Sequence, residues 1–594
     1  MNELVNIKIN GNSLAVTNNT TILEAARLVG IQIPTLCYLR EINAIGACRI
    51  CVVEVKGSRT LMAACVQPVA EGMEIVTNSP KVFDARKTTL ELILSTHSKE
   101  CLTCVRSDNC ELQKLCNIFK VDDENKYAGV TPSRPIDDSA VHLSRDNNKC
   151  ILCRRCIAAC SVWQGLGVIG ANDRGFDTHI SCAFDMPLSM VSCVSCGQCI
   201  TVCPTGAISE KNNSDEVWEA LNDPKKHTVV ETAPSIRATL GEAFGLPVGT
   251  DVTGRMAAAL RRLGFDRVFD TNLAADMTIV EEARELTERM QGKGPLPLIT
   301  SCSPGWVKYC EYYYSDMIPH LSTCKSPQQM FGATVKTWYA EKMGWDPKDV
   351  FVVGIMPCTA KKFEVKRDDQ SASGFFDVDV ALTTRELAQM IDRAGISFNE
   401  LPDEEFDNTM SESTGAAVIF GTTGGVMEAA LRTAAEWLEG GYSKKVEFKS
   451  VRGTEGLKEA TYTINGHTLN VAAISGLANA RQVMDDLRAG ESKYHFIEVM
   501  CCPGGCINGG GQPVQPASVR NFVDLKAKRA EVLYNADSRK HLRKSHENPS
   551  LNKIYSEFFG EFGSHKAHEI LHTSYKDRSA RKYSANINNK KADE

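Results

Sequence analysis

Cysteine spacing is the feature that most constrains how this chain can fold. The chain has 24 cysteines, and two stretches repeat one pattern, CILCRRCIAAC at 150–160 and CVSCGQCITVCP at 193–204. Each stretch has the spacing C-x2-C-x2-C-x3-C. A chain of 594 residues can bury several hydrophobic cores without disulfide bonds, so cysteines at such short fixed spacings indicate metal binding. We therefore expect small lobes built around metal sites.

The repeated pattern resembles that of bacterial ferredoxins, which hold two 4Fe-4S clusters. In those proteins the fourth cysteine of each run binds the other cluster. The resemblance implies two sets of ligands, Cys150, Cys153, Cys156 and Cys203 for one cluster and Cys193, Cys196, Cys199 and Cys160 for the other. The first run departs from the ferredoxin pattern at Ser161, where a proline often follows. We expect this two-cluster domain at residues 138–212.

A different cysteine pattern begins the chain. Strand-like LVNIKING and SLAVT and helix-like TTILEAARLVG come before Cys37, Cys48, Cys51 and Cys65. This order resembles a ubiquitin-like 2Fe-2S ferredoxin domain, which we expect at residues 1–79. The spacing C-x10-C-x2-C-x13-C differs from the plant type and resembles the first module of the large iron-sulfur subunit of complex I. Zinc is the alternative, although zinc sites usually use two close cysteine pairs.

The stretch HSKECLTCVRSDNC combines one histidine with three cysteines, His97, Cys101, Cys104 and Cys110. Taken alone, this set of ligands could bind zinc. Behind a 2Fe-2S module it resembles the His-ligated 4Fe-4S cluster of the complex I and hydrogenase lineage, in which one imidazole replaces a thiolate. We expect this domain at residues 80–120.

From about residue 225 the pattern changes to alternating strands and helices. HTVVETAP, PLPLITS, DVFVVGIMP and AAVIFGTTGG read as strands, and TIVEEARELTERMQ and SPQQMFGATVKTWYAEKMG read as helices. This alternation predicts an α/β domain with parallel strands at residues 225–515, within a multidomain α+β and α/β chain. Its cysteines follow strands, and ligands bind at the carboxyl ends of strands in such sheets. Cysteines that are far apart in sequence can therefore meet at one site.

Three of these cysteine stretches, TSCSPGW, MPCTAKK and EVMCCPGGCINGGGQP, resemble the signature loops of the iron-iron hydrogenases in order and spacing. With the upstream clusters, the resemblance covers nearly the whole chain and extends to the catalytic subunits of NAD(P)-linked members. The family's active site is the H-cluster, a 4Fe-4S cubane joined through one cysteine sulfur to a diiron unit with carbonyl, cyanide and a bridging amine dithiolate. The resemblance implies that Cys358, Cys502 and Cys506 hold the cubane, with Cys506 as the bridge.

The first signature loop departs from the family, which has two adjacent cysteines there. In the family the first cysteine relays protons and the second is the fourth cubane ligand. Position by position, Cys302 takes the relay place and Ser303 the ligand place, although iron prefers thiolate to hydroxyl. A local shift is the alternative, with Cys302 as the ligand and Ser303 as the relay.

The same resemblance implies a proton path. Glu282, Glu285 and Arg289 recur at helical spacing and lie on one face of an expected helix, which alone would indicate a solvated surface. In the family, these positions and Ser322 form the path from the relay cysteine, with Arg289 at its outer end. Carboxylates and hydroxyls can both accept and donate protons, so the residue types fit this role.

Further residues match positions that contact the cofactor in the family. Lys361 would bind an iron cyanide through charge-assisted hydrogen bonds. The residues expected to surround the diiron unit are Ala233, Pro234, Ser235, Gln328, Met356, Phe420 and Met500. Without the resemblance, the methionines and the phenylalanine would be read as core packing.

Five cysteines have no assigned cluster: Cys116, Cys182, Cys310, Cys324 and Cys501. We expect them to be small buried residues, with Cys324 and Cys501 close to the signature loops. HEILH at 568–572 matches the helix motif of zinc proteases, but its polar surroundings offer no third ligand. Residues 535–585 instead resemble the hydrogenase small subunit, a helical belt, and residues 586–594 are expected to be a disordered tail.

Composition indicates neither nucleic acid nor a membrane as a partner. The net charge is -6, and no apolar run reaches the roughly 18 residues that a membrane helix needs. MNELVNIKIN lacks the features of a secretory signal, so we expect a cytoplasmic protein.

The sequence thus predicts a hydrogenase that interconverts hydrogen with protons and electrons. Electrons would pass through one 2Fe-2S and three accessory 4Fe-4S clusters to ferredoxin or to a flavin-bearing NAD(P)-binding subunit, because no G-x-G-x-x-G pattern is present. H-cluster maturation proteins are further implied partners. The alternatives are a non-catalytic electron-transfer subunit, and an H-cluster-bearing sensor or cluster-assembly relative. Sensors usually lack a complete proton path.

Overall fold

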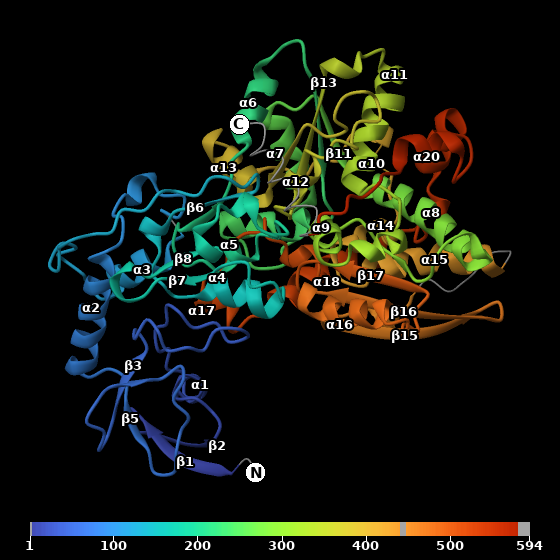
Figure 1. Ribbon diagram of the computed structural model, residues 1–594. Helices are drawn as coiled ribbons and strands as arrows, with labels where there is room; N and C mark the ends of the chain where they lie inside the picture. Colours follow the sequence, from blue (N-terminus) through green and yellow to red (C-terminus); the bar gives the residue numbers. More distant parts are fainter. Residues whose placement is uncertain (1–2, 108, 411, 440–446, 580–594) are drawn as a thin grey trace, which may run out of the picture.

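The computed structural model describes residues 3–107, 109–410, 412–439 and 447–579. In Figure 1 the N-terminal module, in blue, extends away from a larger body formed by the middle and the end of the chain. Among these residues, no helix combines the length and the apolar character needed to span a bilayer. The predicted tail at 586–594 lies outside the described residues.

The N-terminal module is a five-stranded sheet with one helix packed on it. The sheet has the order β2-β1-β5-β3-β4. Its strands are β1 (Leu4–Ile9), β2 (Asn12–Thr17), β3 (Val52–Val55), β4 (Met62–Ala63) and β5 (Glu74–Val76), and the helix is α1 (Ile22–Leu28). β1 alternates exposed and buried residues, as expected for a strand with one face on the core. The strands and the helix expected from the sequence are therefore present.

Two helices connect this sheet to the next lobe. α2 (Pro80–Leu94) and α3 (Glu111–Ile118) pack against each other and enclose a small hydrophobic cluster around Leu90 and Leu115. The buried Arg155 of the following lobe donates a hydrogen bond to Glu111 at 2.6 Å and to the Cys37 carbonyl at 3.4 Å. One guanidinium thus joins three cysteine-containing modules.

The two cysteine runs lie in a lobe with an internally repeated fold. β6 (Leu143–Arg145) pairs with β9 (Ile208–Glu210), and β7 (Gly170–Asn172) pairs with β8 (His179–Ser181), both antiparallel. Short helices α4 (Arg155–Ala158) and α5 (Gln198–Val202) each contain one cysteine of a run. The residue before each helix, Arg154 or Gly197, has a left-handed backbone conformation. The sequence repeat is therefore also a structural repeat.

The α/β domain expected at residues 225–515 contains two four-stranded sheets. The first has the order β11-β10-β13-β14 and is entirely parallel. Its strands are β10 (His227–Thr232), β11 (Arg267–Asp270), β13 (Val350–Met356) and β14 (Val380–Thr383). The second has the order β12-β17-β16-β15, formed by β12 (Leu298–Ile299), β15 (Leu457–Ile464), β16 (His467–Ser475) and β17 (Phe496–Met500). The expected parallel α/β architecture is confirmed, except that β15 joins its sheet antiparallel.

Long helices cover these sheets. They include α7 (Thr253–Leu263), α8 (Asn272–Glu288), α13 (Thr384–Arg393), α15 (Gly425–Glu439) and α16 (Leu477–Arg488). The stretch SPQQMFGATVKTWYAEKMG forms α10 (Pro327–Thr334), a π-helical turn and α11 (Ala340–Met343) in succession. Thirteen of the residues of α8 are buried, because it packs against α10 and α15. α8 is therefore a core helix, which matters for the carboxylates it carries.

One strand expected from the sequence is wrong. AAVIFGTTGG forms α14 (Gly415–Val418) followed by a 3-10 turn over Ile419–Gly421. Thr414 caps this helix by accepting a hydrogen bond from the Ala417 backbone N–H at 3.3 Å. The segment is buried on all sides, so its apolar residues carry no periodicity that would separate a helix from a strand.

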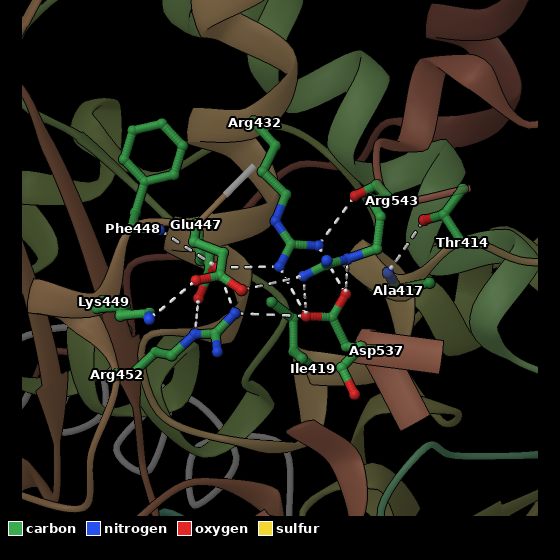
Figure 2. A network of polar contacts seen from close by, with 12 residues as sticks. Thr414, Ala417, Ile419, Arg432, Glu447, Phe448, Lys449, Arg452, Asp537 and Arg543 are labelled. Carbon is green, nitrogen blue, oxygen red and sulfur yellow. Dashed lines mark hydrogen bonds and ion pairs between the residues drawn. The ribbon is translucent and has the colours of Figure 1, made fainter. Parts of the chain in front are cut away.

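The last part of the chain wraps the main domain with helices, drawn in orange and red in Figure 1. They are α18 (Leu525–Arg539), α19 (Pro549–Ile554) and α20 (His565–Leu571). Figure 2 shows how α18 is held: Asp537 accepts hydrogen bonds from Arg432 of α15 and from Arg543. α20 packs against α10.

Candidate active site

Loops from both sheets meet around one buried cavity. β10, β12, β13 and β17 end at Thr232, Ile299, Met356 and Met500, and the chain after each strand enters the cavity wall. The cavity has a volume of about 80 Å³. Ligand sites in open α/β sheets form at carboxyl ends of strands, and this site is arranged in that way.

Every residue predicted to hold or surround the cofactor lines this cavity. The residues expected as cubane ligands, relay and cyanide contact are Cys302, Ser303, Cys358, Lys361, Cys502 and Cys506. Those expected around the diiron unit are Ala233, Pro234, Ser235, Gln328, Met356, Phe420 and Met500. The structure thus brings together residues that the sequence separates by more than 270 positions.

Glycines allow the loops to approach one another closely. A Cβ atom on Gly509 would lie 2.1 Å from the Pro357 carbonyl oxygen, and one on Gly510 would lie 2.1 Å from the Cys196 carbonyl oxygen. Distances this short exclude any side chain. The glycine stretch therefore packs the third signature loop against both the second loop and the ferredoxin lobe.

The thiols and the glycine-lined backbone fit an iron-sulfur cofactor. Cys358, Cys502 and Cys506 supply soft sulfur ligands within one buried space. The Gln328 side-chain oxygen is buried and has no hydrogen-bond partner among the described residues, so the wall offers an unused polar atom. This donor set suits iron better than calcium or magnesium, which prefer oxygen ligands.

Lys361 is held at the cavity wall by a group that sequence reasoning missed. Its ammonium donates to Glu364 and to Ser326, each at 2.8 Å. Glu364 also accepts from Gln328 at 3.1 Å, so one carboxylate orients two wall residues. Burial alone would lower the pKa of Lys361, but the Glu364 carboxylate raises it. The i,i+3 spacing of Lys361 and Glu364 was the available sequence signal.

Thr271 and Cys501 also line the cavity without having been predicted there. Thr271 follows β11 and donates a hydrogen bond to the buried Glu231 at 2.8 Å. Cys501 is next to a predicted ligand, and its adjacency to Cys502 was the signal in the sequence.

The residues of the expected proton path form a connected row. Arg289 donates to Glu285 at 2.6 Å, and Ser322 donates to the other Glu285 oxygen at 3.0 Å. Ser322 also lies within hydrogen-bonding reach of Glu282, whose second carboxylate oxygen has no partner in the described part of the chain. The Glu282 carboxylate also raises the pKa of the Cys302 thiol, and Cys302 lines the cavity. The row therefore runs from the cavity to Arg289.

Burial changes the acidity of this row. Burial, and then the neighbouring Glu285 carboxylate, raise the pKa of Glu282 to about 8. Burial, and then Glu282, raise the pKa of the Cys302 thiol well above its ordinary value. Both groups therefore hold a proton near neutral pH.

The ferredoxin lobe contains two smaller cavities, each lined by one predicted set of cysteines. Cys150, Cys153, Cys156 and Cys203 line a cavity of about 20 Å³. Cys160, Cys193, Cys196 and Cys199 line another of about 40 Å³. Each cavity takes three cysteines from one run and one from the other, which is the exchange expected from the ferredoxin resemblance.

The cysteines of the N-terminal module also gather. The thiol of Cys37 lies within hydrogen-bonding reach of those of Cys48 and Cys65, and the thiol of Cys51 lies within reach of Cys65. In the next segment, His97 has a ring nitrogen with no partner among the described residues. Burial lowers the pKa of His97 to about 4, which favours the neutral imidazole that metals bind.

The ferredoxin lobe contacts the loops of the main cavity directly. Gln198 donates a hydrogen bond to the Asn508 carbonyl at 2.9 Å, and Thr359 donates to the Ser195 carbonyl at 2.7 Å. Cys196 lines both its own cavity and the main cavity. The two sites therefore share a wall.

The C-terminal segment packs against α8 and against the proton row. His572 of HEILH contacts Thr323 at 2.8 Å and Glu281 at 3.2 Å. Tyr555 donates to Glu281 at 2.5 Å, and Tyr575 donates to the Ser322 carbonyl at 2.5 Å. The motif thus serves to seat the helices against α8.

Family comparisons agree with this arrangement. Residues 226–510 match the iron only hydrogenase large subunit, C-terminal domain, and residues 523–578 match the iron hydrogenase small subunit. Residues 2–80 match a 2Fe-2S iron-sulfur cluster binding domain, and residues 86–125 match the NADH-ubiquinone oxidoreductase-G iron-sulfur binding region. Residues 149–207 match a 4Fe-4S dicluster domain.

Two relatives are similar to this chain over nearly its whole length. The NADP-reducing hydrogenase subunit HndD of Solidesulfovibrio fructosivorans is 48% identical over 96% of this chain and 99% of its own length. Iron hydrogenase 1 of Clostridium pasteurianum is 46% identical over 96% of this chain and 99% of its own length.

Solved structures resemble the catalytic part. An FeFe hydrogenase HydA(deltaEFG), a stage of stepwise H-cluster assembly, is 42% identical, covers 61% of this chain and 98% of its own, and has a TM-score of 0.54. An FeFe hydrogenase studied for oxygen inactivation of the H-cluster 2Fe subcluster is 40% identical, covers 62% of this chain and 100% of its own, and has a TM-score of 0.55. The chain belongs to the iron-iron hydrogenases and is an FeFe hydrogenase with accessory iron-sulfur domains.

Proposed function

We propose that the main cavity holds an H-cluster, at which this hydrogenase interconverts hydrogen with two protons and two electrons. When bound, the H-cluster supplies the metal and the bridging amine at which hydrogen is split. The main support for the proposal is that Cys358, Cys502 and Cys506 line one buried cavity. The carboxyl groups of the proton row provide further support. Cys506 is proposed as the bridging ligand.

Protons leave through the row that begins at Cys302. Cys302 lines the cavity, and Glu282 raises the pKa of its thiol, so the thiol would hold a proton and release it toward that carboxylate. Ser322 links Glu282 to Glu285, and its hydroxyl can accept a proton from one carboxyl while donating its own to the other. Arg289 ends the row and keeps Glu285 oriented.

The remaining wall residues orient and shield the cofactor. Lys361 carries a charge that can hold a cyanide ligand through hydrogen bonds, and Glu364 fixes its position. Met356, Phe420 and Met500 are almost fully buried, and they exclude water from the apolar side of the cavity. Ala233, Pro234, Ser235 and Gln328 also line the cavity.

Electrons leave through the ferredoxin lobe. Cys196 belongs to the cysteine set of one proposed cluster and also lines the main cavity, so the two cofactors would be neighbours. The second 4Fe-4S cluster, the His97 cluster and the 2Fe-2S cluster would continue the chain of four accessory clusters toward the N-terminal module. Arg155 supports this order, because it bridges the modules that carry the last three.

The electron acceptor is proposed to be ferredoxin or a flavin-bearing NAD(P)-binding subunit. The similar HndD is named as a subunit of an NADP-reducing hydrogenase, which supports the second choice. A cytoplasmic location is proposed, because 24 cysteines in one chain are best kept reduced there. H-cluster maturation proteins are further proposed partners.

Isotope exchange tests this function without an electron partner. Protein matured with an H-cluster should exchange deuterium gas with the hydrogen of water, because exchange requires only cleavage and proton transfer. Cys302→Ala should keep the cofactor and reduce the exchange rate by roughly 100-fold or more. An inactive parent protein with a complete cofactor would contradict the proposal.

A further inference from the structure

The main cavity has three predicted cubane thiolates, whereas a 4Fe-4S cubane presents four irons to the protein. Cys358, Cys502 and Cys506 account for three of them. The fourth position falls to Ser303, whose hydroxyl is a poorer ligand for iron than a thiolate. A further thiolate on the same wall would complete the set.

Cys501 is that additional cysteine. It lines the same cavity as the three predicted ligands and Ser303. Its backbone N–H donates a hydrogen bond to the Ser303 hydroxyl oxygen at 3.2 Å, so residues 303 and 501 are direct neighbours although 198 positions separate them. A Cβ atom on Gly305 would lie 2.7 Å from the Cys501 sulfur, which places that sulfur at the start of α9 (Pro304–Tyr313).

The backbone lets two successive cysteines face one cavity. In a strand, neighbouring side chains point to opposite faces. β17 ends at Met500, however, and Cys501 and Cys502 lie in a bend. Both residues line the cavity, and their thiols lie within hydrogen-bonding reach of each other.

The other two candidates have different partners. The Ser303 hydroxyl accepts the Cys501 N–H, so it already has a structural role in joining the first and third signature loops. Cys302 lines the cavity and packs against the hydrophobic cluster that includes Ile279 and Leu286 of α8, the helix that carries Glu282, the first carboxylate of the proton row. Assigning Cys302 to the cubane would leave that row without its first member.

We propose that Cys501 supplies the fourth thiolate of the cubane in place of Ser303. The third signature loop then contributes Cys501, Cys502 and Cys506, the second loop contributes Cys358, and the first loop keeps Cys302 free for protons. This inference rests on the H-cluster proposed above. It also predicts that a cysteine at 303 and a cysteine at 501 are interchangeable.

The Cys501 sulfur has a second environment that defines the rival role. It lies within hydrogen-bonding reach of Cys196 and 3.7 Å from the Gln164 side-chain oxygen. A thiol in this place could donate a hydrogen bond to the sulfur of Cys196 and tune the neighbouring cluster instead of binding iron. The two roles predict different amounts of iron per chain when Cys501 is replaced.

Variants of the full chain separate these roles. The set consists of Cys501→Ala, Ser303→Ala, Cys302→Ala and the double variant Cys501→Ala with Ser303→Cys. Cys310→Ala is the matched control, because Cys310 is a buried cysteine of α9 that bonds to the Tyr314 carbonyl rather than lining the cavity. Iron per chain is measured after reconstitution, and the infrared bands of iron-bound carbonyl and cyanide are measured after maturation.

The proposal is supported if, among the single variants, only Cys501→Ala loses iron and the infrared bands. Cys501→Ala should lose about four irons per chain and its infrared bands, while the electron paramagnetic resonance of the accessory clusters persists. The double variant should regain both the iron and the bands. Ser303→Ala, Cys302→Ala and Cys310→Ala should keep the parent iron content.

Other outcomes overturn it. Full iron in Cys501→Ala, with or without a shifted potential of the neighbouring cluster, means that Cys501 is not a ligand. Iron loss in Ser303→Ala or Cys302→Ala alone would assign the fourth position to that residue. Failure of the larger proposal looks different, because then the parent protein itself would show no carbonyl or cyanide bands.

Discussion

At the scale of single residues, the chemistry depends on a carboxyl group kept protonated inside the protein. Glu282 lies on α8 with an exposed fraction of 1% and within hydrogen-bonding reach of Ser322. Burial raises its pKa to about 8, near the pH at which a proton carrier works best. Such a group can both take and release protons under cellular conditions.

Replacing Glu282 by Gln should therefore stop proton transfer while leaving the cofactor in place. Hydrogen evolution from a reduced dye should fall by roughly 100-fold or more, because positioned proton carriers contribute on that order. Glu288→Gln is the matched control, since Glu288 is on the same helix but pairs with Arg284 at the surface. Equal losses in both variants, or a loss of the cofactor bands in Glu282→Gln, would contradict the relay role.

The same carboxyl group predicts a pH effect on stability. Its pKa is raised from 4.5 to about 8 in the folded protein, so folding favours the protonated form. The favourable contribution is complete below pH 4.5 and is lost as the pH rises toward 8. Glu282→Gln removes this dependence, so its unfolding temperature relative to the parent should rise between pH 5 and pH 8. A constant difference across this range would argue against a raised pKa.

Residue types and their order predicted the cavity wall well. All thirteen residues that the family resemblance assigned to the cofactor line the main cavity, eight of them in the three signature loops. Glu364 and Cys501 were missed for a physical reason. Their roles arise from contacts with Ser326, Gln328 and Ser303, which only the folded chain brings near.

At the scale of secondary structure elements, α15 and α18 are locked by buried charges. Arg432 is fully buried and donates to Asp537 at 2.8 and 2.9 Å and to Glu428 at 2.9 Å. Arg452 and Arg543 also reach this group, as Figure 2 shows. The network fixes the first helix of the C-terminal segment on the domain that holds the cavity.

Removal of one member should loosen this contact strongly. Asp537→Ala removes the carboxylate that Arg432 and Arg543 share and leaves the buried Arg432 with Glu428 as its one carboxylate partner in the described part of the chain. Breaking a buried pair in this way costs about 3–5 kcal/mol in comparable cases. The measurement is the apparent unfolding midpoint of the full chain, together with the rate of proteolysis at α18. Asp215→Ala is the control, because its pair with Arg393 is exposed and should contribute about 1 kcal/mol or less. Equal effects of the two substitutions would show that the network does not hold α18.

Elements with clear periodicity were predictable, and fully buried ones were less so. β1, β2 and α1 have one buried face each, and the sequence showed them. α14 and the 3-10 turn after it are buried throughout, and their shared stretch AAVIFG reads equally as a strand. The feature that favours a helix here is the N-terminal cap, in which the single hydroxyl of Thr414 accepts a hydrogen bond from the Ala417 N–H.

At the scale of the whole molecule, the modules are ordered so that electrons can leave the buried cavity. The ferredoxin lobe contacts the cavity loops at Ser195 and Gln198, and Arg155 ties it to the N-terminal modules. The order of modules was readable from cysteine spacing. Their contacts were not, because they depend on backbone carbonyls and glycines that carry no spacing signal.

A break in this electron route should slow electron transfer to the 2Fe-2S cluster and leave hydrogen cleavage at the main cavity intact. Cys193→Ser alters the cluster nearest the main cavity without touching the cavity wall. Hydrogen should then reduce the 2Fe-2S cluster at least about tenfold more slowly, because the rate of electron transfer between clusters falls steeply with distance. Isotope exchange at the main cavity should persist. The check is the appearance of the reduced 2Fe-2S signal after addition of hydrogen. An unchanged rate of reduction would mean that electrons take another path.

The most direct test of the account is the infrared spectrum of the matured full-length protein, recorded beside its hydrogen turnover. We expect bands from iron-bound carbonyl and cyanide together with catalytic exchange of hydrogen. A protein that is correctly matured and fully loaded with iron, yet shows neither these bands nor turnover, would contradict the assignment of an H-cluster to this cavity.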